Sequence, residues 1–411
     1  MGAAAKNPGS LKQGRRRDQE NLLSTEDRMT LGKKALWLVL WLAGPLARAD
    51  DAADADRLFA HAEARYSRYF SPATQPTQSL QGYLVRYYPD TNTYLGVRDG
   101  DVYVYGQVFG VGILRVGRLS EFIEVSPADI TDLLLTRRSP DCATYAGYYT
   151  ASARDVARNL NFTGSLAIAV SNGSCTFTSN NIPNHPMGQG GAFATPVSAQ
   201  NSSFRVSATP AFAAQNTPIS LTWNNAVLLN GVRVDMFAAA CFGVGDGRIG
   251  CNNDSQPWRY DPMSPRNSFG TDVHNAHTQP DGAYHYHGNP LALFDLSGNA
   301  LSPVVGFAAD GFPLYGPFIA SEQGGFRKVR SSYRLKAGNR PTGSGNPGGV
   351  YDGTYRDDYE FVSGLGDLDA CNGMTVAGSY GYYITDAFPY MNNCFRGTPD
   401  PSFRKGAAPP R

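Results

Sequence analysis

The sequence predicts a mainly β protein with a minor helical part, in which a small helix-plus-β-meander module precedes a β-rich C-terminal domain. Three observations lead to this fold class. Short runs rich in Tyr, Val and other β-forming residues recur between Gly, Asn, Asp and Pro turn signals. One segment, residues 54–70, has clear helical periodicity. Six cysteines offer disulfide bonds that would stabilise a fold of short strands.

Residues 1–49 have the pattern of an export leader. Lys33 and Lys34 precede the apolar run 35–43, and Ala47-Arg48-Ala49 is a cleavage signal of the A-x-A type. The run is too short for a stable membrane anchor. Met29 is an alternative start, which would make residues 1–28 an extension. We therefore expect a secreted or periplasmic chain, beginning at Asp50, with no integral membrane segment.

Charge and cysteine content narrow the class of partner and the compartment. Residues 1–49 hold nine Lys or Arg and four Asp or Glu, so the totals of 36 and 35 fall to 27 and 31, a net charge of −4. A mildly acidic chain without a basic run argues against nucleic acid as a partner. An even number of cysteines in an exported chain predicts disulfides. Sequence proximity favours the pairs Cys142–Cys175, Cys241–Cys251 and Cys371–Cys394.

Residues 50–125 are predicted to form the N-terminal module. The helix of 54–70 ends at Ser71-Pro72, and the β-rich runs of 80–120 alternate with turn signals such as Asp99-Gly100. This combination resembles a small module that recurs at the N-terminus of exported bacterial proteins. Its tyrosines form an aromatic ladder, which is typical of sheet packing and is also a candidate glycan-binding surface.

Residues 126–203 are predicted to hold a small β-module and a linker. Ser126-Pro127 is a good start for a short helix, and the stretch from Cys142 to Thr178 alternates polar and β-branched residues. Residues 179–203 are rich in Asn, Gly and Pro, which is the composition of a linker. We expect His185, which lies in that linker, to be a loop histidine rather than a ligand.

The main chemical signal is a histidine cluster. Four of the six histidines lie within residues 272–290: His274, His277, His285 and His287. In a strand, His285 and His287 share one face and Tyr284 and Tyr286 the other. The turn signal Pro280-Asp281-Gly282 would bring His277 beside them. Imidazole suits Zn, Cu and Fe, so the cluster predicts a transition-metal site. A buried hydrogen-bond network and a metal-free catalytic histidine are the alternatives.

Carboxylates extend the candidate site. Asp272 precedes the cluster, and Asp310 ends the apolar strand predicted for 304–308, just before a Gly turn. Either is a candidate metal ligand, and Asp310 is also a candidate general base or a partner that orients an imidazole. For Asp310 the alternative is a turn-stabilising role. Gly245-Asp246-Gly247 and Asp254 make Ca²⁺ a second candidate cofactor, although this run does not match the EF-hand template.

Several motifs resemble those of the YHYH family, named for the tetrapeptide at 284–287. Besides Asp272 to Pro290, the matching segments are 229–232, 258–260, 305–316, 368–373 and 382–390. The resemblance covers about residues 205–403 and implies a YHYH domain over 204–403. We expect residues 404–411 after it to be a disordered tail. It implies the location of a site, and neither a reaction nor a substrate. Tyr380-Gly381-Tyr382-Tyr383 echoes the tetrapeptide without its histidines, and we expect the two strands to face one another.

The leading hypothesis is an exported protein that binds a transition metal through His277, His285 and His287, completed by Asp272, His274 or Asp310, either as a metal-dependent enzyme or as a binding protein. The alternative is a non-catalytic protein of the cell surface that binds a glycan or another partner and in which the His/Tyr cluster is structural. Whether the chain is an enzyme, and which small molecule it meets, stay open. The sequence lacks H-E-x-x-H, G-x-S-x-G, C-x-x-C and a phosphate loop, which argues against the enzyme classes built on them.

Overall fold

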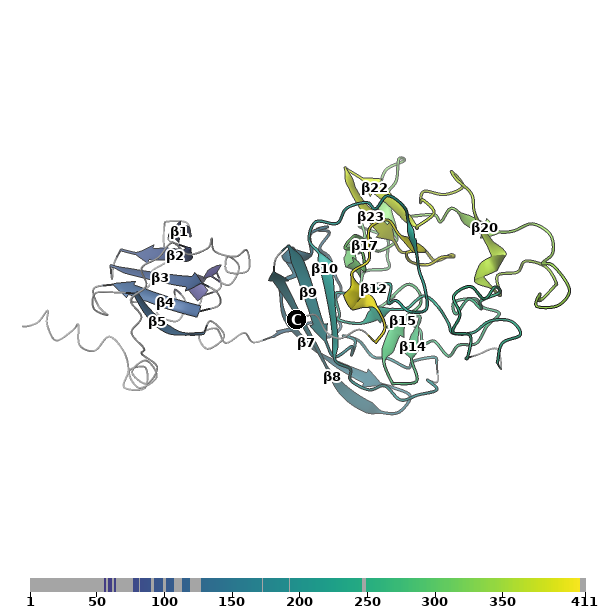
Figure 1. Cartoon of the computed structure of the whole chain (residues 1–411), viewed down its shortest axis with the longest axis horizontal. Coiled ribbons are helices and arrows are strands. Elements are labelled where there is room, and N and C mark those ends of the chain that lie inside the picture. Colours follow the sequence, from purple (N-terminus) through teal and green to yellow (C-terminus); the bar gives the residue numbers. More distant parts are fainter. Residues whose placement is uncertain are drawn as a thin grey trace, which may run out of the picture. The chain divides into compact units, whose positions relative to one another are not determined.

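The computed structural model describes residues 127–406 apart from 172, 192 and 246–248. Before them it describes residues 113–118, residues 77–106 with short gaps, and six positions between 55 and 63. The predicted leader and the last five residues of the predicted tail lie outside the described residues. The chain divides into two compact units, Met1–Val125 and Ser126–Arg411. The fold is mainly β, as predicted (Figure 1).

The first unit contains an antiparallel meander of five strands paired in sequence order. The strands are β1 (Gln78–Leu80), β2 (Tyr83–Tyr88), β3 (Thr93–Arg98), β4 (Asp101–Gly106) and β5 (Ile113–Arg118). The described residues between 55 and 63 are helical, and Leu58 and Phe59 are buried with Val97 of β3 in one apolar cluster. The rest of the predicted helix of 54–70 lies outside the described residues.

The predicted aromatic ladder crosses three strands of this meander. The ring of Tyr94 lies 4.6 Å from that of Tyr87 and 6.0 Å from that of Tyr105. Tyr105 is exposed. Glycan binding by this surface stays a prediction.

The second unit begins with a five-stranded sheet in the order β10-β9-β8-β7-β6. Its strands are β6 (Ala128–Asp129), β7 (Gly147–Asp155), β8 (Leu160–Ser171), β9 (Ser174–Ser179) and β10 (Ser202–Ser207), and the 3-10 turn η3 (Cys142–Tyr145) precedes β7. The short helix predicted to start at Ser126-Pro127 is absent from the described residues, since β6 pairs there with β7. The segment 179–203 is no exposed linker, because Ile182, Met187 and Phe193 are buried in the main core.

An eight-stranded sheet packs against this first sheet, in the order β14-β15-β13-β12-β16-β17-β23-β22. Its strands are β12 (Ala226–Leu228), β13 (Arg233–Val234), β14 (Ala276–Thr278), β15 (Tyr284–Tyr286), β16 (Val304–Ala308), β17 (Pro313–Tyr315), β22 (Gly373–Val376) and β23 (Ser379–Tyr383). The Phe307 ring of β16 meets Phe177 of β9, with ring centroids 6.0 Å apart. Every residue of β15 and β16 is buried, so both faces of the sheet centre are covered.

The eight-stranded sheet consists of two half-sheets with the same connectivity. In the first, β12 pairs with β13, β13 runs parallel to β15, and β15 pairs with β14. In the second, β16, β17, β23 and β22 repeat these three pairings in the same order. At the centre β12 and β16 are antiparallel, with Ala226 opposite Ala308, Val227 opposite Phe307 and Leu228 opposite Gly306.

Hydrogen bonds confirm that the half-sheets correspond residue by residue. Tyr284 donates to Asp272 at 2.9 Å, and Tyr380 donates to Asp369 at 3.0 Å. Asn275 and Asn372 both have left-handed backbones, with φ of 62° and 66°. The echo between 284–287 and 380–383 is therefore structural. The two strands do not face one another, however, because four strands separate β15 from β23.

Three pairs of short strands and two 3-10 turns complete the unit. The pairs are β11 (Thr217–Pro218) with β24 (Cys394–Phe395), β18 (Phe318–Ala320) with β19 (Phe326–Lys328), and β20 (Tyr333–Leu335) with β21 (Tyr359–Phe361); the turns are η4 (Arg356–Asp358) and η5 (Pro401–Phe403). The three disulfides are Cys142–Cys175, Cys241–Cys251 and Cys371–Cys394, the pairs that sequence proximity predicts. Within the described part of the chain, no helix has the length and hydropathy to span a bilayer.

Candidate metal centre

The β14–β15 hairpin brings three histidines together. His277 stands directly opposite His285 in the antiparallel pair. His287 follows two residues later, so its side chain lies on the same face as that of His285. The turn between the strands needs glycine at position 282, where φ is +83° and a Cβ would lie 2.4 Å from Ser198 Oγ. The predicted fold-back around Pro280-Asp281-Gly282 is therefore present.

The Nε2 atoms of the three rings converge. His287 Nε2 lies 3.0 Å from both His285 Nε2 and His277 Nε2. Nitrogen ligands of a tetrahedral Zn²⁺ ion are about 3.3 Å apart, given Zn–N bonds of about 2.0–2.1 Å, and cis ligands of an octahedral ion are about 3.0 Å apart. Among the described residues, these three are the one group of three or more His, Cys, Asp or Glu side chains that could hold a metal ion.

The outer ring nitrogens fix the tautomers of two histidines. His277 Nδ1 contacts the carbonyl of Phe269, and His285 Nδ1 lies 3.2 Å from the carbonyl of Ala283. A carbonyl can only accept, so both rings donate from Nδ1 and keep a lone pair on Nε2. His287 Nδ1 is buried without a hydrogen-bond partner. A proton on His287 Nε2 can be donated to only one of the two neighbouring Nε2 lone pairs, so the other lone pair stays without a donor. A single metal cation can accept the lone pairs of all three Nε2 atoms.

Burial keeps the triad neutral at pH 7. It lowers the pKa of His277, and it lowers the pKa values of His285 and His287 further, well below the usual range. For His285 and His287 the neighbouring imidazoles act in the same direction, because a second positive charge in the cluster would be repelled. Arg233 adds to the effect on the pKa of His285, and Lys405 and Arg356 to that on His287. Neutral imidazoles are the form that binds a metal.

Asp235 is a neighbour of the triad that sequence reasoning missed. It follows β13, which runs parallel to β15, and its backbone N–H donates to Tyr286 O at 3.0 Å, which places it beside His287. Its Oδ2 contacts Lys405 Nζ at 2.5 Å and Gln279 Nε2 at 2.6 Å. Its Oδ1 is buried without a hydrogen-bond partner. The only sequence feature that pointed to Asp235 was its alternation with Arg233 in a predicted strand. The local sequence does not show which strand lies next to β15.

Asp272 and His274 do not join the triad. Asp272 accepts hydrogen bonds from Tyr284 and from the backbone N–H of Gly188, so it serves the tyrosine face of β15. The ring of His274 packs against that of His185, with centroids 4.3 Å apart. The start of the tail predicted for 404–411 is ordered. Residues 404–406 are described, and the backbone of Arg404 pairs with that of Trp223. Lys405 contacts Asp235 beside the triad.

His185 is a buried hydrogen-bonding residue and not an exposed loop histidine. Its Nδ1 lies 2.7 Å from Pro186 O, and its Nε2 lies 2.6 Å from the hydroxyl of Tyr286. The ring therefore donates from Nδ1 and accepts from the tyrosine. Burial lowers the pKa of His185 to about 3, and the adjacent His274 lowers it as well.

The depressed pKa of His185 predicts acid sensitivity. An unfolded histidine has a pKa of about 6.5. The free-energy contribution is therefore fully present above pH 6.5 and is lost as the pH falls from about 6.5 to about 3. We expect His185→Gln to reduce the slope of unfolding free energy against pH by about 1.4 kcal/mol per unit between pH 6 and 4. Urea unfolding of metal-free protein measures it, and equal slopes for both proteins would contradict the assignment.

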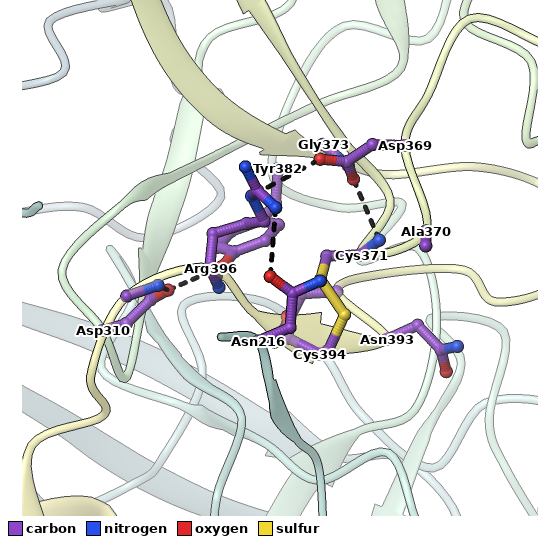
Figure 2. Close-up of a disulfide and its surroundings, with 12 residues drawn as sticks. Asn216, Asp310, Asp369, Ala370, Cys371, Gly373, Tyr382, Asn393, Cys394 and Arg396 are labelled. Atoms are coloured by element: carbon purple, nitrogen blue, oxygen red, sulfur yellow. Dashed lines mark hydrogen bonds and ion pairs between the residues drawn. A yellow bond between two sulfur atoms is a disulfide. The ribbon is translucent and has the colours of Figure 1, made fainter. Parts of the chain in front are cut away.

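Asp310 lies in the other half-sheet, where it corresponds to Asn230. Its Oδ2 accepts from the Tyr382 hydroxyl at 2.6 Å (Figure 2). The same oxygen accepts from Gly397 N at 2.9 Å. Asn230 forms the matching contact, to the Tyr286 hydroxyl at 3.1 Å. Burial raises the pKa of Asp310. The structure thus places Asp310 in the turn-stabilising role and does not bring it to the histidines.

The second half-sheet has no room for a triad. The strand registers align His277, His285 and His287 with Met374, Gly381 and Tyr383. A Cβ on Gly381 would lie 2.6 Å from the ring of Tyr315, and that ring stacks on Tyr383 with centroids 5.1 Å apart. The aromatic pair fills the space that the imidazoles occupy in the first half-sheet.

The calcium candidate gains no support from the described residues. Asp246 and Gly247 lie outside them. Asp254 accepts from Leu221 N at 2.7 Å, and Asn253 accepts from Ser255 N at 3.0 Å. These oxygens stabilise the segment that directly follows the Cys241–Cys251 disulfide.

A family model described as YHYH protein matches residues 203–397, which confirms the resemblance seen in the motifs. No curated protein and no solved structure matches the chain.

Proposed function

We propose that the YHYH domain of this chain, residues 203–397, binds one transition metal ion through His277, His285 and His287. The observation that carries the proposal is the convergence of three Nε2 atoms within 4.8 Å of one another, with that of His287 lying 3.0 Å from each of the other two. Backbone carbonyls hold the rings of His277 and His285. A buried cluster of neutral imidazoles with facing lone pairs is poorly satisfied without a cation.

Three neutral nitrogen ligands favour Zn, Cu or Fe over Mg or Ca. Thiolate ligands do not compete, because all six cysteines form disulfides. The disulfides are also typical of an oxidising compartment, which supports the proposal that the protein is secreted or periplasmic.

A three-histidine ion supplies a Lewis acid with an open coordination position. In this chain, the unpartnered Oδ1 of Asp235 is the group beside the triad that can accept a proton there. Lys405 and Gln279 hold the other oxygen and so orient the carboxylate. We therefore propose a metal-dependent centre in which Asp235 positions the molecule that would occupy the open coordination position of the metal ion.

Elemental analysis tests the proposal. The chain from Asp50 to Arg411 is produced through an oxidising export pathway and purified without chelators or a metal-affinity column. We expect about one equivalent of Zn, Cu or Fe, and a gain of about 2.7 kcal/mol in unfolding free energy when free metal stands at 100 times Kd. If no transition metal binds even after reconstitution, the cluster is a packed histidine network and the proposal fails.

A further inference from the structure

A pocket of about 300 Å³ lies in the second unit, and none of the triad histidines lines it. It is formed by the loop after β13, by strands β20 and β21, and by η4. Its volume is at the lower end of the range of small-molecule sites, so it suits a ligand with a single ring. The residues that determine its chemistry are Asp254, Gln256, Tyr333, Asp357 and Tyr359.

The charges around this pocket compensate one another. Arg259 and Arg356 both line it, and burial lowers the pKa of each. Asp254 and Asp357 oppose this effect on the pKa of Arg259, and Asp261 and Asp357 oppose it at Arg356, so each cation has carboxylates nearby. The pocket therefore has no surplus positive charge that would attract an anion, and its arginines would repel an added cation.

The two arginines hold the walls together and are not the groups that a ligand reaches. Arg259 donates to Ala238 O at 2.7 Å and to Asn253 O at 2.8 Å. Arg356 Nη2 donates to Asn393 Oδ1 at 2.6 Å, and its Nη1 is buried. A ligand must therefore be recognised by the other polar groups of the pocket.

Three polar side chains are available for that recognition. Asp254 is exposed, and Gln256 and Asp357 are half-buried. Each carboxylate gives one oxygen to a backbone N–H, that of Leu221 at 2.7 Å and that of Arg259 at 3.0 Å. Among the described residues, the second oxygen of each carboxylate and the amide of Gln256 form no hydrogen bond. Two acceptors and one amide match a neutral ligand that carries several hydroxyl groups.

Aromatic side chains supply the apolar part of the wall. The half-buried rings of Tyr333 and Tyr359 pack on the buried ring of Phe388, with centroids 5.3 and 4.1 Å apart. The hydroxyl of Tyr333 donates to Ala370 O at 2.7 Å, which fixes that ring in place. Aromatic rings attract apolar atoms, and their negative faces favour the weakly positive C–H groups of a saturated ring.

We propose that this pocket binds a neutral pyranose sugar. The hydroxyl groups of the sugar donate to the second oxygens of Asp254 and Asp357 and exchange hydrogen bonds with Gln256. Its C–H face packs against Tyr333 and Tyr359. A pyranose with equatorial substituents meets both requirements, because its hydroxyl groups spread around the rim of the ring while its faces carry only C–H groups. The inference does not depend on a metal.

Saturation-transfer difference NMR on the chelator-treated chain from Asp50 to Arg411 tests the proposal. The probes are methyl β-D-glucopyranoside, whose ring substituents are all equatorial, and its charged counterparts methyl β-D-glucosaminide and methyl β-D-glucuronide. We expect the neutral glycoside to bind with a Kd on the order of 1 mM, as the usual efficiency of small ligands allows. Both charged counterparts should bind at least about tenfold more weakly, because each adds an unpaired charge to a balanced pocket.

Two variants locate the site. Asp357→Asn keeps an oxygen for the backbone N–H of Arg259 but removes the charged acceptor, so affinity should fall about ten- to a hundredfold. Gln256→Ala removes a side chain that forms no hydrogen bond among the described residues, so the variant should fold normally and bind about two- to tenfold more weakly. Glu360→Gln is the matched control and should leave affinity unchanged, because Glu360 follows Tyr359 in β21 and does not line the pocket.

Two further variants separate this pocket from the other candidate sites. Tyr94→Ala alters the aromatic ladder of the first unit, and His285→Ala/His287→Ala removes the triad. Both proteins should bind the neutral glycoside with unchanged affinity.

Three results would overturn the proposal. Absence of binding of the neutral glycoside at concentrations well above the expected Kd would show that the pocket is not a sugar site. Tighter binding of either charged counterpart would show a site for an ion. Unchanged affinity in both Asp357→Asn and Gln256→Ala would place the sugar elsewhere, on the aromatic ladder if Tyr94→Ala abolishes binding.

Discussion

Replacing His285 and His287 together by alanine is expected to abolish stoichiometric metal binding. One imidazole then remains of three, and the converging geometry at 3.0 Å is lost. Affinity for Zn, Cu or Fe should fall by several orders of magnitude, because a lone histidine resembles any surface histidine. Elemental analysis of wild type and variant, purified side by side, measures the effect, and circular dichroism checks that the variant is folded.

His274→Ala is the matched control for this loss. His274 belongs to the same sequence cluster but packs on His185, on the tyrosine side of β15. We expect this variant to keep about one equivalent of metal. If the double variant keeps one equivalent of metal, the triad is not the metal site. If His274→Ala loses its metal, His274 is a ligand, and the geometry of the triad does not identify the ligands correctly.

Arg340→Met is expected to cost about 3–5 kcal/mol of unfolding free energy, the usual penalty for removing one partner of a buried ion pair. Arg340 Nε and Nη2 contact the two carboxylate oxygens of Asp358 at 2.7 and 2.5 Å. The side chains are 7% and 0% exposed. Asp358 also accepts from the backbone N–H groups of Gly353 and Tyr355, so its unpaired charge could not turn towards water.

Arg334→Met provides the comparison for this prediction. Arg334 contacts Glu360 at 2.9 Å, but the two side chains are 57% and 37% exposed, so the loss should stay below about 1 kcal/mol. Urea unfolding of the three proteins measures both changes. Similar losses for the two variants would mean that the Arg340–Asp358 pair is hydrated in solution.

The triad was predictable because its geometry is local. A period of two along a strand and one tight turn suffice to bring His277, His285 and His287 together. Asp235 was not predictable, because its place beside His287 depends on the parallel pairing of β13 and β15, some fifty residues apart in the sequence. Parallel neighbours leave no local signal of their register.

Polar composition misled the sequence analysis at residues 179–203. Asn184 and His185 have the composition of a linker, yet each forms hydrogen bonds within the core, to Ile130 O and to the Tyr286 hydroxyl. The sequence left the role of Asp310 open between a site carboxylate and a turn-stabilising residue. A carboxylate after a buried strand is as suitable for closing a turn as for binding a metal, and only its bond to Tyr382 decides between the roles.

The pairing at the centre of the eight-stranded sheet has the symmetry of a homodimer joined into one chain. Ala226 faces Ala308, the counterpart of Leu228, and Leu228 faces Gly306, the counterpart of Ala226. This reciprocal contact is the mark of an isologous two-fold interface. Two separate copies would have to change together, whereas a fused pair can keep the histidines in one copy and fill the other with Tyr315 and Tyr383. The fusion thus allows one half-sheet to carry the histidine triad while the other serves only to support the fold, and the eight-stranded sheet that they share is unchanged.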